Sequence, residues 1–576
     1  MKRHHLYDGN STRRPLFRLI IPPVPYPNVF SHIAMPPLGA LYVATAAKEH
    51  GLWDVEVIDG LNWRSGVSRR ELAKDPFADH RDLQARRPAR AVGFYAGLTS
   101  TVPRVFELAQ LYRSLGVRTI AGGAHVDALP REALESGIDI VVHGEGEETI
   151  KEVLDAWSAE RPIDGIRGIS FLDPDSRMIT TESRGPICDL DNLPIPDFDL
   201  LVEKRRSLTI APFERTRGCS FSCEFCVVHD RFGPSRSKSP ERVALELEKR
   251  VDSGFRQFFC VDDNFIQGRK GTMNLLGLIC DLQKRKRVRL NLTIQARSSV
   301  GRDEELMQAM RSAGIEMIAV GLESPIGEEL EEMAKHQTPE QIESDVRNMR
   351  RHGFMIHGMF IFGYPLEGSL RGTGLTLRER ADRYLSFIRR TRLDTIQVLK
   401  PVPVPGSRLA ERLARQKRIL PLDVVGWDKY DGNYLTFLPD LGISATELQK
   451  QANRIMRRFY SRLSFLKFPL LVLETPVEIL RMGFQRAGEF ARSRADLAQA
   501  GNKERVRHDS ALRAGFREAG SEIARRWRDA FFRTLGSHVV TVAFKTGGHS
   551  KFLAVLTDIQ AVMRQREEKT AGTSGA

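Results

Sequence analysis

Short apolar runs alternate with amphipathic stretches along the first 165 residues. The runs are rich in β-branched residues, most end in glycine, and they cover residues 17–23, 55–60, 91–97, 117–123 and 138–144. Between them, residues 38–51 and 104–116 carry apolar side chains at helical spacing. Buried strands that alternate with helices predict an α/β fold with a doubly wound, Rossmann-like parallel sheet. Ligands of such sheets bind beyond the carboxyl ends of the strands, which is where these glycines lie.

A second series of the same kind begins at residue 207. Its six apolar runs cover residues 208–216, 255–263, 290–298, 317–324, 355–365 and 395–406. Helical stretches such as 239–254, 304–314 and 339–353 separate them. Six βα units without a seventh or eighth predict a partial (β/α)6 barrel, with polar residues at the strand ends where barrels keep their chemistry.

The breaks between these patterns predict the domain boundaries. Prolines and aspartates in residues 187–201 interrupt any regular period, which is typical of an interdomain linker. The expected segments are an N-terminal domain at 1–165, a linker at 166–206, the barrel at 207–405, a barrel-closing extension at 406–460 and a basic, mainly helical C-terminal region at 461–576.

Composition places the chain among globular proteins. Of its 576 residues, 41% are hydrophobic and 28% are charged, and no run of about 18 apolar residues suggests a transmembrane helix. The basic N-terminal stretch lacks the apolar core and cleavage site of a secretory signal. Six cysteines in a chain of this length are typical of reduced thiols in a cytoplasmic protein.

The net charge of +14 is concentrated near the C-terminus. By count, residues 450–576 hold about 24 lysines and arginines against about 12 acidic residues. Residues 512–535 combine arginines with an apolar stripe at spacings of three or four. Such a segment suits a helical cap packed on the barrel, or else peripheral contact of residues 461–576 with the inner face of an anionic membrane.

Three cysteines within eight residues are the strongest chemical signal. Cys219, Cys223 and Cys226 follow an Arg-Gly step with C-x3-C-x2-C spacing, one ligand short of a tetrahedral metal site. One interpretation adds His229 and gives a closed Cys3His zinc site. The other is an iron–sulfur cluster with one open iron, which can bind a substrate directly.

C-x3-C-x-Φ-C behind a first barrel strand resembles the radical S-adenosylmethionine superfamily. The resemblance implies that the three cysteines hold a [4Fe–4S] cluster and that S-adenosyl-L-methionine fills its fourth position. In this superfamily a Gly-Gly-Glu sequence usually binds the amino group of the methionine, and that sequence is absent here. Either of two aspartates can take its place. The implied contacts are Phe225 near the adenine, Asp262 and Asp263 at the methionine ammonium, and Gln295 and Glu323 at the ribose or carboxylate. Each of these side chains has an alternative role as a strand-end cap or a core hydrogen-bond partner.

The N-terminal domain has a resemblance of its own. Residues 36–42, 55–60, 121–130 and 141–149 are similar to the cobalamin-binding domain that is fused to many radical S-adenosylmethionine enzymes. Glycines let the backbone approach a corrin ring closely, and the resemblance implies cobalamin contacts at Gly39, Gly122, Gly123 and Gly144. No Asp-x-His-x-x-Gly motif is present, and His125 lacks that context, so cobalamin is expected base-off. The alternative is an unspecialised Rossmann-like domain that has lost its cofactor.

The resemblance as a whole implies a cobalamin-dependent radical S-adenosylmethionine C-methyltransferase. A 5′-deoxyadenosyl radical would take a hydrogen from an unactivated carbon of a small-molecule or lipid substrate, and methylcobalamin would supply the methyl group. The cofactors carry this chemistry, while the protein positions them. An electron donor such as flavodoxin or ferredoxin is also implied.

Three alternatives remain. An oxidoreductase or cyclase would use the same cofactors without methyl transfer. A tRNA-modifying enzyme would use the basic tail to bind RNA, but thiomethylating enzymes need a second three-cysteine cluster. The other cysteines, Cys188, Cys260 and Cys280, are far apart in sequence, so a nucleic-acid partner is not expected. The last alternative is a non-enzymatic, zinc-stabilised binding module.

Overall fold

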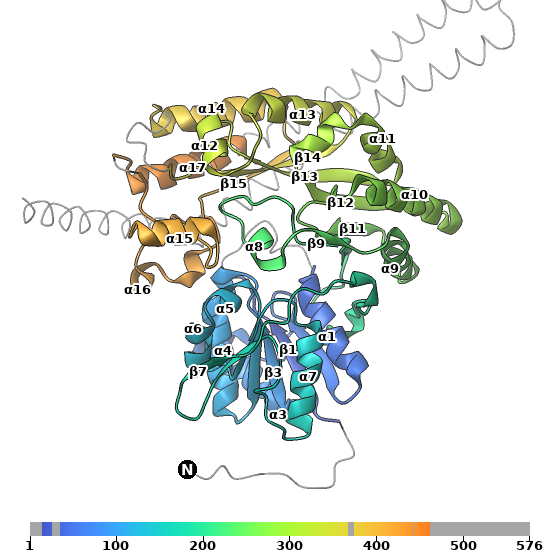
Figure 1. Ribbon diagram of the computed structural model, residues 1–576, viewed down its shortest axis with the longest axis vertical. Helices are drawn as coiled ribbons and strands as arrows, with labels where there is room; N and C mark the ends of the chain where they lie inside the picture. Colours follow the sequence, from blue (N-terminus) through green and yellow to red (C-terminus); the bar gives the residue numbers. More distant parts are fainter. Residues whose placement is uncertain (1–13, 26–34, 367–373, 441, 461–576) are drawn as a thin grey trace, which may run out of the picture.

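The computed structural model describes residues 14–25, 35–366, 374–440 and 442–460. The predicted C-terminal region, 461–576, lies outside the described residues. Two α/β units are stacked in the described part, with the N-terminal unit (blue) below the barrel unit (green to yellow) in Figure 1.

A seven-stranded sheet forms the N-terminal unit, in the order β2-β1-β3-β4-β5-β6-β7. β1 to β5 pair in parallel, and β6 and β7 extend the sheet antiparallel. The strands are β1 (Leu16–Ile21), β2 (Asp54–Asp59), β3 (Ala91–Tyr95), β4 (Arg118–Gly122), β5 (Ile140–Val142), β6 (Ile169–Leu172) and β7 (Met178–Thr180). The helices are α1 (Leu38–His50), α2 (Arg69–Lys74), α3 (Ala78–Arg86), α4 (Val102–Ser114), α5 (Ala124–Ala128), α6 (Pro130–Glu135) and α7 (Glu147–Ser158). The predicted parallel α/β sheet is confirmed. The segment predicted as a linker, 166–206, contains β6 and β7, the last two strands of this sheet.

Both faces of this sheet are buried, as the uninterrupted apolar runs of the sequence predict. Phe17 and Leu19 of β1 point into a core that also holds Leu41 of α1, whereas Ile20 belongs to a second core with Leu108 of α4. Each such side chain contributes about 1.5–3 kcal/mol of burial free energy. The two cores fix the sheet as the middle layer of three.

The barrel unit contains six parallel strands in the order β15-β14-β13-β12-β11-β8. These are β8 (Ile210–Phe213), β11 (Gln257–Cys260), β12 (Asn291–Ala296), β13 (Ile315–Glu323), β14 (Met355–Ile361) and β15 (Thr395–Leu399). The helices that follow them are α9 (Pro240–Asp252), α10 (Arg269–Lys286), α11 (Glu304–Ser312), α12 (Gly327–Glu332), α13 (Pro339–Arg351) and α14 (Leu377–Thr391). The predicted partial (β/α)6 barrel is therefore confirmed.

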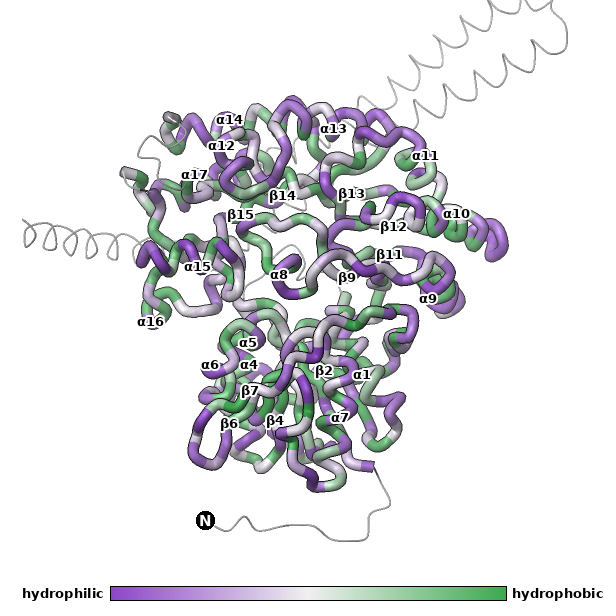
Figure 2. The backbone as a smooth tube through the Cα atoms, viewed as in Figure 1, coloured by the Kyte–Doolittle hydropathy of each residue, from purple (hydrophilic) through white to green (hydrophobic). Residues whose placement is uncertain are grey.

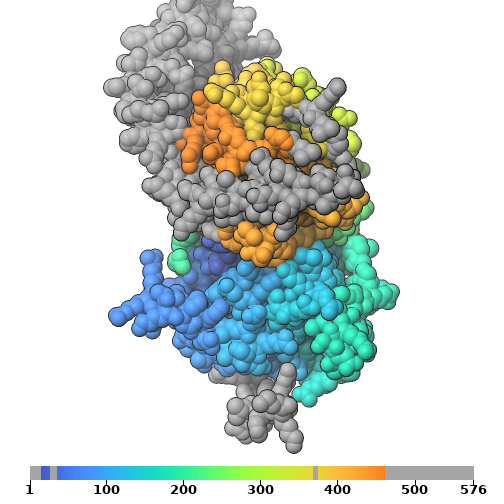
Figure 3. Space-filling view, turned by 90° about the vertical axis from the view of Figure 1, so that its left-hand side faces the viewer, coloured from blue at the N-terminus to red at the C-terminus, as the bar shows by residue number. Residues whose placement is uncertain are grey.

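The segment after the last barrel strand covers the edge of the barrel and touches the N-terminal unit. It contains α15 (Arg408–Arg415), α16 (Leu422–Val425) and α17 (Ala445–Phe459). Tyr460 at the end of α17 bonds through its hydroxyl to both backbone groups of Ile396 in the edge strand β15. In the side view of Figure 3 this segment (orange) lies against the N-terminal unit (blue).

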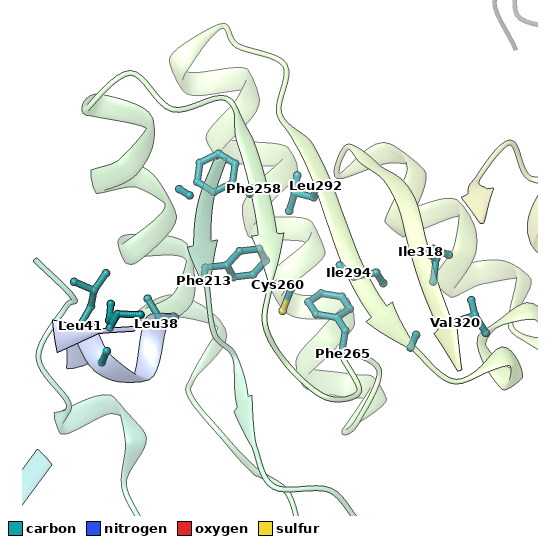
Figure 4. Close-up of a cluster of buried hydrophobic side chains, with 14 of the residues drawn as sticks. Leu38, Leu41, Phe213, Phe258, Cys260, Phe265, Leu292, Ile294, Ile318 and Val320 are labelled. Carbon is teal, nitrogen blue, oxygen red and sulfur yellow. The ribbon is translucent and has the colours of Figure 1, made fainter. Parts of the chain in front are cut away.

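One apolar core runs through both units. The cluster in Figure 4 joins Phe213, Phe258 and Leu292 of the barrel to Leu38 and Leu41 of α1. Apolar segments (green) lie inside the units and polar ones (purple) mark the outer helices in Figure 2. In the described ranges, no helix is both long and apolar enough to cross a membrane.

Candidate functional site

The three predicted cluster cysteines lie in one loop between β9 (Thr216–Arg217) and α8 (Val228–Phe232). β9 pairs with β10 (Arg236–Ser237) and closes this loop, residues 217–236, which we call the cluster loop. The chain turns at Gly218, where a φ of +81° and the close carbonyl oxygen of Gly233 leave no room for a Cβ atom. The glycine of the Arg-Gly step is thus required by the backbone.

All three cysteines are free thiols. Burial raises the pKa of the Cys226 thiol to about 12 and also raises that of Cys219. A thiolate in this loop therefore needs a nearby positive charge, which a bound metal or iron–sulfur cluster supplies. His229 donates from Nδ1 to the backbone oxygen of Cys219, at 2.7 Å.

The described residues contain no preassembled group of three or more metal-ligating side chains. The loop geometry alone therefore does not decide between the zinc and the iron–sulfur interpretations. That decision comes from the domain in which the loop lies.

The two predicted aspartates at the end of β11 have different surroundings. Asp262 is buried and accepts bonds from the backbone N–H of Arg215 at 2.7 Å and the hydroxyl of Thr216 at 2.8 Å. Asp263 instead lines a cavity, and burial, with the neighbouring charges of Asp262 and Glu214, raises its pKa to about 6. Of the pair, Asp263 is the carboxylate that a ligand can reach.

The remaining predicted contacts lie at the carboxyl ends of their strands or in the cluster loop. Gln295 donates weakly to the backbone oxygen of Asp262, at 3.4 Å. Glu323 has a φ of +59° and pairs with the buried Lys335 at 2.8 Å. Phe225 packs edge-on against Tyr364, with ring centroids 6.4 Å apart. Their roles toward S-adenosyl-L-methionine stay predictions.

A cavity of about 340 Å³ lies where the two units meet. All four glycines predicted to contact cobalamin, Gly39, Gly122, Gly123 and Gly144, line its wall on the side of the N-terminal unit. A Cβ atom at Gly123 would collide with the backbone of residue 96, while Gly39 and Gly144 have no atom within 4 Å of that position. Bare backbone around an open cavity fits a large flat ligand such as a corrin.

The barrel side of the same cavity is polar. It is formed by residues of the first two barrel strand ends and of the cluster loop: Glu214, Thr216, Arg217, Gly218, Arg231, Phe232, Val261 and Asp263. The structure therefore brings the predicted glycines, Asp263 and the beginning of the cluster loop to one cavity.

His125 lies away from this cavity. Its Nε2 is 3.2 Å from a carboxylate oxygen of Glu132, and its ring packs on Trp427 with centroids 4.8 Å apart. No histidine among the described residues lines the cavity. Base-off binding of cobalamin, without His125 as a cobalt ligand, stays a prediction.

The charged residues that join the two units could not be predicted from the sequence. Residues 141–149 were noted for their glycines, but Glu145 and Glu147 of that stretch bind Arg217 of the cluster loop. Isolated acidic and basic residues give no signal of pairing across 70 positions, so only the structure reveals them.

Comparison with known proteins assigns both units. The sequence matches the family described as B12 binding domain over residues 32–154 and the Radical SAM superfamily over residues 213–368.

Several curated proteins are similar over much of the chain. An uncharacterized methyltransferase of Pyrococcus horikoshii is 30% identical over 406 residues, or 69% of this chain and 81% of that protein. The anaerobic magnesium-protoporphyrin IX monomethyl ester cyclase of Rubrivivax gelatinosus is 25% identical over 75% of both chains. The hopanoid C-2 methylase of Rhodopseudomonas palustris is 28% identical over 42% of this chain, which spans less than half (44%) of that relative.

Solved structures agree with the fold. The cobalamin-dependent S-adenosylmethionine radical enzyme OxsB, solved with aqua-cobalamin and S-adenosylmethionine, superposes with a TM-score of 0.57 at 16% identity, covering 98% of this chain and 81% of that one. At this identity the likeness concerns the fold alone.

Proposed function

Because the chain belongs to the family of cobalamin-binding radical S-adenosylmethionine enzymes, we propose that it methylates an unactivated carbon of a small-molecule or lipid substrate. The observation that carries this proposal is the shared cavity, which the glycines of the B12-binding domain line on one side and the base of the cluster loop and Asp263 line on the other. A substrate in this cavity would lie between the two cofactors.

The residues present fit the cofactors of both domains. Cys219, Cys223 and Cys226 would hold the [4Fe–4S] cluster, and Asp263 would accept bonds from the ammonium of S-adenosyl-L-methionine. The four cavity glycines would lie against cobalamin. When bound, these groups supply one-electron reduction of a sulfonium, hydrogen abstraction and a transferable methyl group.

The contribution of the chain itself is to position these groups and to exclude water. Phe17, Leu19 and Ile120 give the cavity an apolar floor, and buried apolar walls keep reactive species from solvent. Asp263 is a carboxylate above its pKa of about 6, so at neutral pH it can accept from an ammonium group.

A second candidate function is an oxidative cyclisation with the same cofactors and no methyl transfer. It is favoured by the similarity to the cyclase of Rubrivivax gelatinosus, which extends over 75% of both chains. The two functions differ in their products from S-adenosyl-L-methionine.

The deciding experiment uses the full chain, purified without oxygen, with its cluster reconstituted and hydroxocobalamin added. It is incubated with methyl-labelled S-adenosyl-L-methionine, a reductant, and lipid or metabolite extracts from a strain that lacks the gene. Methyl transfer predicts labelled product with both 5′-deoxyadenosine and S-adenosylhomocysteine, and a Cys219→Ala variant that forms none of them. Substrate-dependent 5′-deoxyadenosine without S-adenosylhomocysteine would contradict methylation and support the cyclase.

We further propose flavodoxin or ferredoxin as the electron donor and a cytoplasmic location with peripheral membrane contact through residues 461–576. The basis for the membrane contact is the excess of basic residues in that region. Co-sedimentation with anionic liposomes should decrease when the chain is truncated after residue 460, and it should weaken with added salt. Equal partitioning of both chains would contradict membrane contact.

A further inference from the structure

Three arginines of the cluster loop bind carboxylates of the B12-binding domain. Arg217 lies two residues before Cys219, while Arg231 and Arg236 follow Cys226. Their partners are Glu145 and Glu147, in the loop between β5 and α7 and the first turn of that helix, and Asp127 in α5. We call these six residues the interdomain clamp.

Arg217 is the centre of the clamp. Its guanidinium lies 2.7 Å from Glu147 and 3.2 Å from Glu145, and it also pairs with Glu214 of its own domain at 3.0 Å. It stacks over the ring of Tyr42 in α1 at 4.9 Å. Burial lowers the pKa of Arg217, but the surrounding carboxylates outweigh this effect and raise it above its ordinary value, so the charge persists.

Arg236 and Arg231 bind the B12-binding domain at two further carboxylates, Glu145 and Asp127. Arg236 forms a fork to Glu145, with two nitrogen–oxygen distances of 3.0 Å. Arg231 pairs with Asp127 at 3.2 Å, and that carboxylate also binds His143 and the backbone N–H of Gly144.

Because these ion pairs are buried, they favour one arrangement of the cluster loop against the B12-binding domain. Side-chain exposure is 10% for Arg217, 3% for Glu145 and 4% for Glu147. A buried charge that loses its partner is strongly unfavourable, whereas an exposed pair can be lost at little cost. The clamp therefore requires the cluster loop and the B12-binding domain to meet in one arrangement.

One backbone segment, residues 144–146, belongs both to the clamp and to the wall of the cavity. Gly144 and Gly146, on either side of Glu145, line the cavity. Glu145 also accepts from the backbone N–H of Ile187 at 2.5 Å, which fixes the carboxylate from a third side. Movement of this glycine-rich backbone must therefore move the groups that hold Arg217 and Arg236.

We propose that Arg217, Arg231 and Arg236 are positioning residues that couple ligand binding in the cavity to the seating of the cluster loop. A corrin that orders the backbone at residues 144–146 would fix Glu145 and Glu147, and these would hold the loop that carries the cysteines. The coupling is reciprocal, because a seated loop must favour corrin binding by the same factor. The identity of the ligand as cobalamin rests on the proposed function.

The test measures binding and loop protection and does not depend on turnover. Hydroxocobalamin is titrated into the full chain with a reconstituted cluster, and amide hydrogen exchange of residues 217–236 is followed with and without it. We compare the wild type with Glu147→Gln, a neutral isostere on the B12-binding side, and with Arg217→Lys on the loop side. Arg269→Ala is the matched control, since this exposed arginine also pairs with two carboxylates, Asp303 and Glu305.

In the wild type, hydroxocobalamin should slow exchange in the cluster loop. Glu147→Gln and Arg217→Lys should weaken hydroxocobalamin binding by about tenfold, within the usual range of coupling between sites, while retaining iron. Because Arg217 and Glu147 also line the cavity, weaker binding alone does not separate coupling from direct contact. The readout of coupling is the induced protection, which both variants should lose even at saturating hydroxocobalamin. Arg269→Ala should match the wild type.

The proposal is overturned if hydroxocobalamin leaves the wild-type loop unprotected, or if both clamp variants keep wild-type affinity and protection. Coupling without methyl transfer would refute the proposed function and support the proposed role of the clamp. Methyl transfer without coupling would support the proposed function and refute the role of the clamp.

Discussion

Two adjacent aspartates at the end of β11 show how closely the site depends on single residues. Asp262 has both oxygens occupied by Arg215 and Thr216, whereas Asp263 lines the cavity. We expect Asp263→Asn to weaken binding of S-adenosyl-L-methionine about tenfold or more, because a charged hydrogen bond contributes about 1.5–3 kcal/mol. Anaerobic calorimetry of the reconstituted enzyme measures this loss.

Asp262→Asn is the matched comparison. It replaces a buried acceptor with a group that has only one acceptor oxygen, so the free energy of unfolding should fall by about 1–3 kcal/mol. Bound S-adenosyl-L-methionine should be retained in the folded fraction. If Asp262→Asn loses the cosubstrate and Asp263→Asn keeps it, the roles are reversed.

The pKa of Asp263 also has a consequence for stability. Burial raises this pKa from 3.8 to about 6. The folded state therefore opposes ionisation, which destabilises it above pH 4. Because Asp263 is exposed at the cavity, solvent screening limits this effect to about 1 kcal/mol or less by pH 7. Without ligands, Asp263→Asn should raise the free energy of unfolding at pH 7, and the gain should vanish as the pH falls to about 4. Urea titrations at both pH values provide the measurement, and a gain that grows toward acid pH would contradict the assignment.

The sequence could predict some of these residues but not others. The cysteines follow from their spacing, and the cavity glycines from their places after strands. Asp262 and Asp263 could not be told apart, because both follow β11 and the contacts of Asp262 with Arg215 and Thr216 are visible only in the folded chain. Glu145 and Arg217 could not be paired, since their contact depends on how the two units dock.

At the scale of elements, the cluster loop depends on the turn at Gly218. Its φ is +81°, and a Cβ atom would lie 2.6 Å from the oxygen of Gly233 and 2.8 Å from that of Pro234. We expect Gly218→Ala to separate β9 from β10 and to reduce iron incorporation severalfold, because both the strain and the collision fall on backbone. Iron and sulfide analysis after reconstitution measures the effect.

Gly277→Ala in α10 is the control for that change. No atom lies within 4 Å of the added Cβ, so the substitution should stabilise the helix by about 0.5–1 kcal/mol and leave iron content unchanged. Equal iron content in the two variants would show that the turn is dispensable.

The regular strands of both units follow from the apolar runs, since buried parallel strands are apolar on both faces. β6 and β7 were missed because they are short and lie among polar and irregular residues. The burial pattern of β7 is one half-buried and two exposed residues, which leaves little signal in the sequence. The edge of the sheet at β5 pairs with β6, and β6 in turn pairs with β7, so these two strands depend on the sheet rather than on their own sequence pattern.

At the scale of the whole molecule, the segment 406–460 fastens the barrel to the B12-binding domain. Trp427 packs on His125, and its indole N–H donates to Glu132 at 2.7 Å. Its ring also meets Tyr430, with centroids 4.7 Å apart. Contacts of this kind, together with the core that runs from α1 into the barrel, predict that the two units unfold together.

We therefore expect Trp427→Ala to lower the free energy of unfolding by about 2–4 kcal/mol. This loss is at or below the usual cost of truncating a large aromatic side chain, because Trp427 is only half-buried. The loss should appear as a lower midpoint and as separation of one cooperative transition into two, because docking and not the interior of either unit is weakened. Leu422→Ala, in the neighbouring α16 and 40% exposed, should change stability by no more than about 0.5 kcal/mol. Calorimetric and circular-dichroism melting curves of the three proteins provide the comparison. A single transition for Trp427→Ala at the wild-type midpoint would show that the domains are held together without this contact.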